Sequence, residues 1–211
     1  MNIQEYTLPA HKHILAAWAA STAANNSTKF RFSVELGKRL LMQCNLSETE
    51  FLERINLVQE FTSQEEFDAW HNSFILEMLD ESRVNEVITR FNLESKKSLD
   101  CRNFTYGIAA KMLNVYLKVF FLGELGAKKF ADFIHPPIDR LLLEQLRKID
   151  KEHFSFKKHD FPNHKLNSGV PAWTQLDNKQ YSLIIQKIKQ YLANQSVEGM
   201  WQIEFAWRGH Q

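Results

Sequence analysis

Residues 104–122 read FTYGIAAKMLNVYLKVFFL, and this stretch decides the fold. Its side chains are apolar around most of the circumference of a helix, and such a helix belongs in the middle of a domain. At about 100° per residue, its polar members Lys111, Asn114 and Lys118 fall within about 60° of one another, with Gly107 beside them. The stretch therefore predicts a central helix with one polar stripe, which either forms a solvent-exposed edge or faces a cleft.

The rest of the chain predicts further helices around this one. The 211 residues include only 7 Gly and 5 Pro, so residues that interrupt helices are scarce. Ser47 and Ser63 are each followed three residues later by a glutamate, which is the signature of a capping box at a helix start. The fold class predicted is an all-α compact bundle of about ten helices. We expect helices over 11–24 (with Ile14, Leu15 and Trp18 as its apolar stripe), 33–44, 82–91, 104–122, 136–149 and 198–207, and others starting near 47, 63 and 177.

Two stretches interrupt the helical pattern. The polar segment 92–100 separates two halves, so the chain is either one helical domain or two lobes, 1–95 and 96–211, flanking a cleft. Between 150 and 173 the periodicity is lost, and a short hairpin in EHFSFKKHDF (152–161) is one option.

Charge and cysteine content exclude several classes of protein. The formal net charge is +1, so a nucleic-acid role requires a local basic patch. Cys44 and Cys101 are too few for a disulfide framework or a zinc site, and we interpret them as reduced core thiols. The first residues lack a signal-peptide pattern, and no apolar run approaches the roughly 20 residues of a membrane-spanning helix. We expect a cytoplasmic protein without a membrane span.

A second group of residues, HPPIDR at 135–140, precedes another predicted helix. Proline fits the first helical turn, so Pro136 and Pro137 place Asp139 in that turn. A carboxylate there is favoured by the helix macrodipole, which explains Asp139 without any function. Alternatively, the rigid turn aims Asp139 at the cleft that Lys111 faces, where partial burial lowers the pKa of the amine and leaves it nucleophilic.

The sequence around these two residues resembles a known family. Residues 107–117, GIAAKMLNVYL, are similar to the stretch G-V-G-x-K-T-A-N-x-x-L that follows the hairpin in helix–hairpin–helix DNA glycosylases of the endonuclease III branch. Residues 137–143, PIDRLLL, resemble the family's P-V-D-T-H-V-x-R. The archaeal-type 8-oxoguanine glycosylases, which have Asp-Arg at this point, are closer still. The resemblance covers about 40 of the 211 residues.

The resemblance implies an activity. In that family a lysine amine attacks C1′ of a damaged nucleoside, expels the base and forms a Schiff base, while an aspartate stabilises the cationic sugar. By motif position Lys111 would be the nucleophile and Asp139 the essential carboxylate. The implied protein has a two-lobed helical fold and acts on DNA, with or without a lyase step. We expect a monomer that needs no cofactor.

The sequence also departs from the family. Ala109 stands in place of the hairpin's second glycine, and the Leu-Pro-Gly lead before Gly107 is absent. Lys111 and Asp139 are 28 residues apart, more than the family commonly uses. A glycosylase-like core with a degenerate hairpin is also similar to phage-linked proteins that act on modified bases, so repair, base modification and phage defence all stay open.

Further DNA contacts are predicted on both sides of this pair. The stretch 150–171 interleaves cations, which suit phosphates, with aromatic rings, which suit base stacking. The alternative is a solvated loop that its phenylalanines attach to the core. Histidine spacing along the chain does not predict a metal site. The candidate DNA-binding residues are Gly107, Asn114, Lys118, Arg140, Lys157 and Lys158, and the candidate stacking residues are Phe156 and Trp173.

Two functions follow from the sequence. The first is a DNA glycosylase that cleaves the N-glycosidic bond of a modified or damaged base. The second is a non-catalytic helical module, for DNA binding or protein interaction, that keeps the same fold. The near-neutral charge and the missing hairpin glycine favour the second. The relative position of Lys111 and Asp139 separates them: an amine and a carboxylate close together across an open cleft support the glycosylase, whereas side chains on opposite faces make the resemblance accidental.

Overall fold

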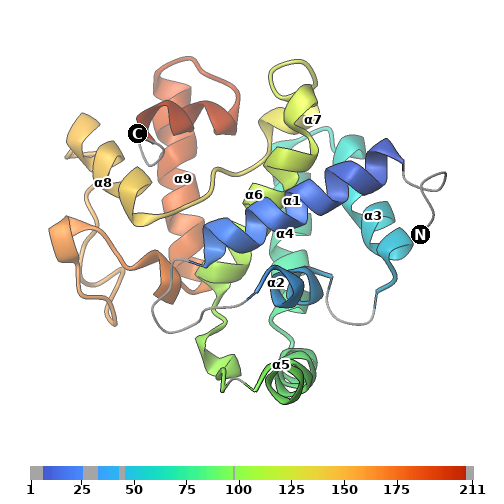
Figure 1. The fold of residues 1–211 in the computed structure, drawn as a ribbon. Coiled ribbons are helices and arrows are strands. Elements are labelled where there is room, and N and C mark those ends of the chain that lie inside the picture. The colour runs from blue at the N-terminus through green and yellow to red at the C-terminus, as the bar shows by residue number, and fades with distance from the viewer. Residues whose placement is uncertain (1–6, 26–32, 43–45, 97, 208–211) are drawn as a thin grey trace.

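The computed structural model describes residues 7–25, 33–42, 46–96 and 98–207, which form an all-α fold (Figure 1). This part of the chain contains helices and turns but no strand, so the predicted fold class is confirmed. None of its helices has the length and apolar character needed to cross a membrane. The α-helices are α1 (Leu8–Ala24), α2 (Val34–Leu41), α3 (Glu48–Asn56), α4 (Gln64–Met78), α5 (Glu81–Ser95), α6 (Tyr106–Phe120), α7 (Lys129–Asp132), α8 (Arg140–Ile149) and α9 (Asn178–Asn194). Among the short 3-10 helices, η6 (Trp173–Gln175) and η7 (Met200–Ala206) lie near the candidate site.

Helix α6 lies at the centre of the molecule, as its composition predicts. Among its 15 residues only Val115, Lys118 and Val119 are not buried. It packs against α1, α4, α9 and η6, and in Figure 1 α1 crosses in front of it. Apolar burial is the main favourable term in folding, so the packing of α4, α9 and η6 on α6 positions much of the site.

Local signals set several helix starts. The capping boxes predicted at Ser47 and Ser63 are present, and Asp177 forms a third one at the start of α9. In each box the side chain of the capping residue accepts a hydrogen bond from a backbone N–H that the first helical turn leaves unpaired. These starts depend only on residues three positions apart, which is why the sequence predicts them.

Four predictions about local structure need correction. Helix α5 continues to Ser95, into the segment expected to be a polar linker. Helix α8 begins at Arg140 and not at the prolines, which lie in the irregular segment 134–139. The stretch 152–161 forms turns and no hairpin, and 198–207 contains the 3-10 helix η7 in place of an α-helix. Cys101 is a free, half-buried thiol, and Cys44 lies outside the described residues.

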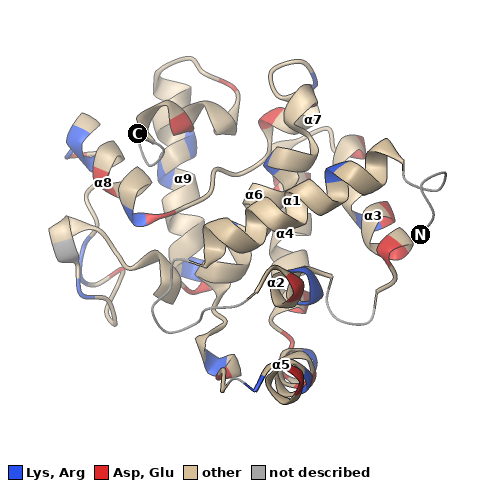
Figure 2. Cartoon of the chain, in the orientation of Figure 1, with Lys and Arg blue, Asp and Glu red and all other residues tan. Residues whose placement is uncertain are grey.

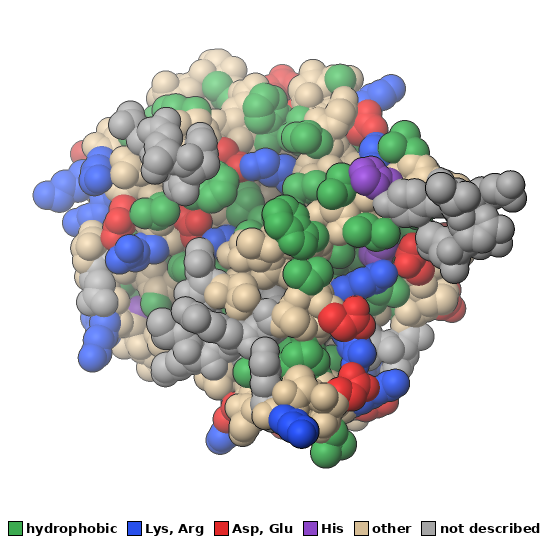
Figure 3. All heavy atoms as spheres, viewed as in Figure 1, with side chains coloured by type: hydrophobic (Ala, Val, Ile, Leu, Met, Phe, Trp, Pro, Cys, Tyr) green, Lys and Arg blue, Asp and Glu red, His purple; other side chains and the backbone are tan. Residues whose placement is uncertain are grey.

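The large apolar residues of α1 face outward, contrary to the stripe expected from their spacing. Trp18 is 56% exposed, and Ile14 and Leu15 are also exposed. The buried face of α1 is instead made mostly of small residues, including Ala16 and Ala20, together with His13. Small side chains let two helix backbones approach closely, which explains why α1 turns this face toward the core. Figure 3 shows hydrophobic side chains on the surface over α1.

Candidate functional site

Lys111, on the polar stripe of α6, is in direct contact with Asp139. Its Nζ donates a hydrogen bond to Asp139 Oδ2 over 3.1 Å. Lys111 is 3% exposed and Asp139 is 6% exposed, so the two form a buried ion pair and do not face each other across a gap. Burial lowers the pKa of Lys111 because the charged amine loses its hydration, and the Asp139 carboxylate offsets part of this effect.

Asp139 is fixed by the start of α8. It is the N-cap residue of that helix and does not lie in the first turn as predicted, and its Oδ1 accepts a hydrogen bond from Leu142 N at 2.9 Å. One carboxylate oxygen therefore caps the helix while the other binds Lys111. Since an N-cap has a defined backbone geometry, the direction of the carboxylate is set by the helix start and not by a flexible side chain alone.

Trp173 and Gly107 border the same ion pair. Lys111 Nζ lies 4.5 Å from the centre of the Trp173 ring, which is a cation–π contact. The backbone of η6 comes this close because position 107 has no side chain: a Cβ there would lie 1.9 Å from Trp173 O. Gly107 N also donates a hydrogen bond to Leu176 O at 3.1 Å. Trp173 is thus a buried ring against Lys111, and the N–H proposed as a DNA contact at Gly107 is bonded within the protein.

Lys118, farther along the stripe, has a carboxylate partner that the sequence did not identify. It forms an ion pair with Glu204 of η7 and lies 5.7 Å from the centre of the Trp207 ring. Burial raises the pKa of Glu204, and the charge on Lys118 opposes that shift. No local signal links Lys118 to Glu204, because 86 residues separate them. The stripe therefore faces two carboxylates, one at each of its lysines.

Asn114 completes the stripe and is fully buried. Its Nδ2 donates to Pro136 O at 3.0 Å and to Tyr181 Oη at 2.9 Å, and its Oδ1 lies 2.7 Å from His71 Nε2. All its hydrogen-bonding groups are therefore used inside the protein. Proposed from the sequence as a DNA contact, Asn114 instead joins α4, α6, α9 and the segment before α8.

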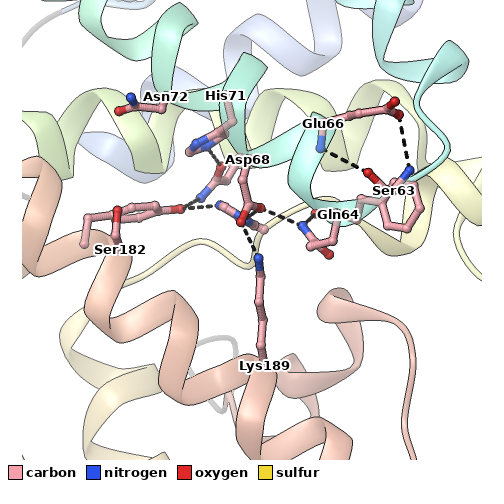
Figure 4. Close-up of polar contacts among 12 residues, drawn as sticks. Ser63, Gln64, Glu66, Asp68, His71, Asn72, Ser182 and Lys189 are labelled. Carbon is pink, nitrogen blue, oxygen red and sulfur yellow. Dashed lines mark hydrogen bonds and ion pairs between the residues drawn. The ribbon is translucent and has the colours of Figure 1, made fainter.

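A second polar cluster extends from Asn114 to a pocket (Figure 4). Tyr181 Oη lies 3.1 Å from His135 Nδ1, and His135 Nε2 lies 2.9 Å from Asp68 Oδ1. Asp68 also forms an ion pair with Lys189. The pocket has a volume of about 290 Å³ and is lined by Asp68, His71, Asn72, Tyr106, His135, Tyr181, Ser182, Ile185, Gln186 and Lys189.

Burial and hydrogen bonding decide the charges in this cluster. Burial lowers the pKa of His71 well below its ordinary value, and it also lowers the pKa of His135, with Asp68 opposing the shift. Burial raises the pKa of Tyr181. For Asp68 burial acts to raise the pKa, but hydrogen bonds from His135 and Lys189 outweigh it and lower the pKa. The cluster therefore combines neutral rings with one charged pair, Asp68 and Lys189.

The spacing of polar residues in the sequence contains a signal for this pocket. Asp68, His71 and Asn72 are three and four residues apart, which places them on one face of α4. Ser182 and Lys189 likewise share a face of α9. What periodicity does not reveal is that these two faces meet. In the described part of the chain no group of three or more His, Cys, Asp or Glu is placed to hold a metal ion.

The stretch 150–171 supplies charges at the surface, but its phenylalanines are buried. Lys157 and Lys158 are exposed, whereas Phe156 is 5% exposed and packs against Phe161 with ring centres 5.6 Å apart. The phenylalanines attach the loop to the core, so Phe156 offers no stacking surface. From Arg140 to residue 165 the chain has seven Lys and Arg against four Asp and Glu. Figure 2 shows basic residues along the α8 side of the molecule.

Comparisons of the chain with protein-family models, with curated proteins and with solved structures gave no match.

Proposed function

We propose that the protein is a DNA N-glycosylase in which Lys111 is the nucleophile and Asp139 the assisting carboxylate. The observation that carries the proposal is the 3.1 Å contact between Lys111 Nζ and Asp139 Oδ2. The resemblance in sequence names these two residues, 28 positions apart, and their side chains meet. The open cleft expected between them is absent because the pair is buried, so the proposed reaction requires that the pair opens.

The chemistry uses the groups at this position. The amine of Lys111, without its proton, forms a bond to C1′ of the nucleoside. The bond from C1′ to the base nitrogen breaks, and its electron pair leaves on the base, which takes up a proton. Asp139 accepts the proton that the lysine releases and passes it to the departing base, and the carboxylate so restored stabilises the positive charge that develops on the sugar. The lowered pKa of Lys111 reduces the cost of reaching the neutral amine.

Access to the amine requires movement of its cover. The ring of Trp173 lies over Lys111 Nζ. The C1′ atom of a nucleoside can therefore come within bonding distance of this nitrogen only after the ring or the lysine side chain moves. The basic stretch that includes Arg140, Lys157 and Lys158 supplies cations for the phosphates of the strand on the α8 side.

The test is cleavage of duplexes that carry single modified bases, such as 8-oxoguanine, uracil and hypoxanthine, followed by alkali. We expect strand breaks at one or more of them, and a borohydride-trapped adduct on Lys111. Lys111→Gln and Asp139→Asn should each lower the rate by roughly 100-fold or more. Lys118→Gln is the matched control, because Lys118 is a second carboxylate-paired lysine on the same stripe, and its rate should change by no more than about threefold. Absence of both cleavage and adduct across the panel rejects the enzyme.

A second candidate is a helical DNA-binding module without catalysis. One observation favours it: Gly107, Lys111, Asn114 and Lys118 all have partners inside the protein. In that case Lys111 and Asp139 stabilise the fold only. Fluorescence anisotropy of a labelled duplex would then show salt-dependent binding that is equal for the parent protein and Lys111→Gln, with no cleavage.

A further inference from the structure

The pocket beside α4 and α9 contains a buried histidine with one nitrogen unused. His71 lines the pocket, and its Nε2 is bonded to Asn114, while its Nδ1 has no hydrogen-bond partner among the described residues. This nitrogen is not among the fully buried polar atoms that lack a partner, so it is open to the pocket, where water or a bound molecule can pair with it. A ligand that donates a hydrogen bond could therefore replace water at this nitrogen.

The hydrogen-bond network determines whether His71 Nδ1 is a hydrogen-bond donor or an acceptor. Pro136 O can only accept a hydrogen bond, so the group of Asn114 that faces it must be the donor Nδ2. The other side of the amide, Oδ1, therefore accepts from His71 Nε2, which must carry the proton. A neutral imidazole has one protonated nitrogen, so Nδ1 of His71 presents a bare lone pair.

The same reasoning fixes the neighbouring histidine. Tyr181 Oη accepts from Asn114 Nδ2, so its own proton is directed to His135 Nδ1. His135 then carries its proton on Nε2 and donates it to Asp68. Every proton of this network has a fixed place, and the pocket receives no proton from His135 or Tyr181. The acceptor at His71 is thus permanent in the neutral state.

The other groups around the pocket restrict the chemical class of ligand that it can bind. Asn72 Oδ1 accepts from Tyr106 Oη at 3.0 Å, which leaves the two N–H groups of Asn72 without a partner among the described residues. His71, Tyr106, His135 and Tyr181 all line the pocket, so much of its wall is aromatic. Aromatic walls favour a flat ligand. The charges of Asp68 and Lys189 cancel, so the pocket does not select for a charged molecule.

We infer that this pocket binds a small, uncharged, planar heterocycle whose N–H donates to His71 Nδ1 and whose acceptor receives a hydrogen bond from Asn72. The volume of about 290 Å³ suits a ligand of one or two rings. Neither Lys111 nor Asp139 lines the pocket, so this site does not depend on the proposed glycosylase. Binding of a free heterocycle and cleavage of DNA are measured separately and can fail separately.

The experiment uses two pairs of probes that differ in their N–H groups. The ¹⁵N-labelled full chain is titrated with benzimidazole and with 1-methylbenzimidazole, and then with uracil and with 1,3-dimethyluracil. The side-chain ¹⁵N resonances of histidine report the tautomer and the hydrogen bond at each ring nitrogen. We expect the free protein to contain the Nε2–H tautomer of His71. Benzimidazole, uracil or both should shift the Nδ1 resonance, and the methylated partner should bind at least about tenfold more weakly.

A variant that fills the pocket tests the location without touching the buried network. Ser182 is exposed and lines the pocket, so Ser182→Trp should weaken binding by roughly tenfold or more. Gln190→Trp is the matched control, since Gln190 is exposed on the same helix and does not line the pocket. The inference is overturned if neither parent heterocycle shifts His71, if the methylated probes bind equally well, or if Ser182→Trp binds as the parent protein does.

Discussion

Two polar clusters meet the polar stripe of α6, one at Lys111 and one at Asn114, and they bury their polar groups differently. At Lys111 and Asp139 the charges themselves are in the interior, and they are directly paired. Around His71 and His135 the interior groups are neutral. The charged pair of that second cluster, Asp68 and Lys189, sits at the edge of the pocket, where their side chains are 36% and 29% exposed.

The difference follows from the cost of desolvation. A buried charge loses several kcal/mol of hydration and is tolerated only with a well-placed partner, so the Lys111–Asp139 pair depends on both members. Neutral imidazole, phenol and amide groups cost less to bury when each hydrogen bond is made. The first cluster is therefore sensitive to loss of one residue. The second can leave one nitrogen, His71 Nδ1, free for a ligand.

Removal of one member of the buried pair should have the largest effect. Asp139→Ala leaves the Lys111 charge without a partner and removes the cap of α8, so we expect a loss of about 3–5 kcal/mol in the free energy of unfolding, measured with urea. Asp139→Asn keeps a capping side chain and should be less damaging by about 1 kcal/mol. The double variant Lys111→Met/Asp139→Asn should recover part of the loss. A change below about 1 kcal/mol for Asp139→Ala would contradict the burial of the pair.

Displacing η6, which packs over the Lys111–Asp139 pair, should have an intermediate effect on the free energy of unfolding. In Gly107→Ala the new Cβ would lie 1.9 Å from Trp173 O, so η6 must move, at a cost of about 1–3 kcal/mol in unfolding free energy. The shift should also make the Lys111 amine more reactive toward an amine-directed reagent, read by mass spectrometry. Gly123→Ala is the control, because nothing lies within 4 Å of that Cβ, and it should change stability by less than about 0.5 kcal/mol. Equal behaviour of the two variants would show that η6 does not pack as described.

Acidification should have the smallest effect, through the second cluster. The folded-state pKa values of His71 and His135 are below the ordinary value of 6.5, so the unfolded chain binds more protons once the pH falls below 6.5. Stability is therefore fully present above that pH and is lost as the pH falls toward the lowered pKa values. We expect a loss of about 1–2 kcal/mol in urea unfolding between pH 7.5 and 5.5.

Other titratable and charged groups also affect the pH dependence of stability, so a variant of His71 is needed as a control. His13 has a lowered pKa and adds to the same loss. Asp68 acts in the same direction at lower pH, because its pKa is lowered from 3.8, and Lys189 faces both histidines as a cation. His71→Gln should reduce the pH dependence between pH 7.5 and 5.5. An unchanged dependence in that variant would argue against a neutral, buried His71.

The candidate site was partly predictable. The period of the helix places Lys111, Asn114 and Lys118 together, and the two prolines mark the region of Asp139. Their partners were not predictable, since Glu204, Tyr181 and Trp173 lie far along the chain and carry no local signal of contact. Periodicity also pointed to Trp18 as a buried residue, and the packing of α1 on its small residues reversed this.

The sequence alone determined what depends on neighbouring residues: the helical class, the capping boxes and the polar stripe of α6. These follow from hydrogen bonds and side-chain directions within one or two turns. The tertiary structure decided which residues far apart in the chain come into contact. It placed Asp139 against Lys111, turned Phe156 into the core and brought α4 and α9 together around His71. Those outcomes depend on how whole helices pack, and packing is a property of all the contacting surfaces at once.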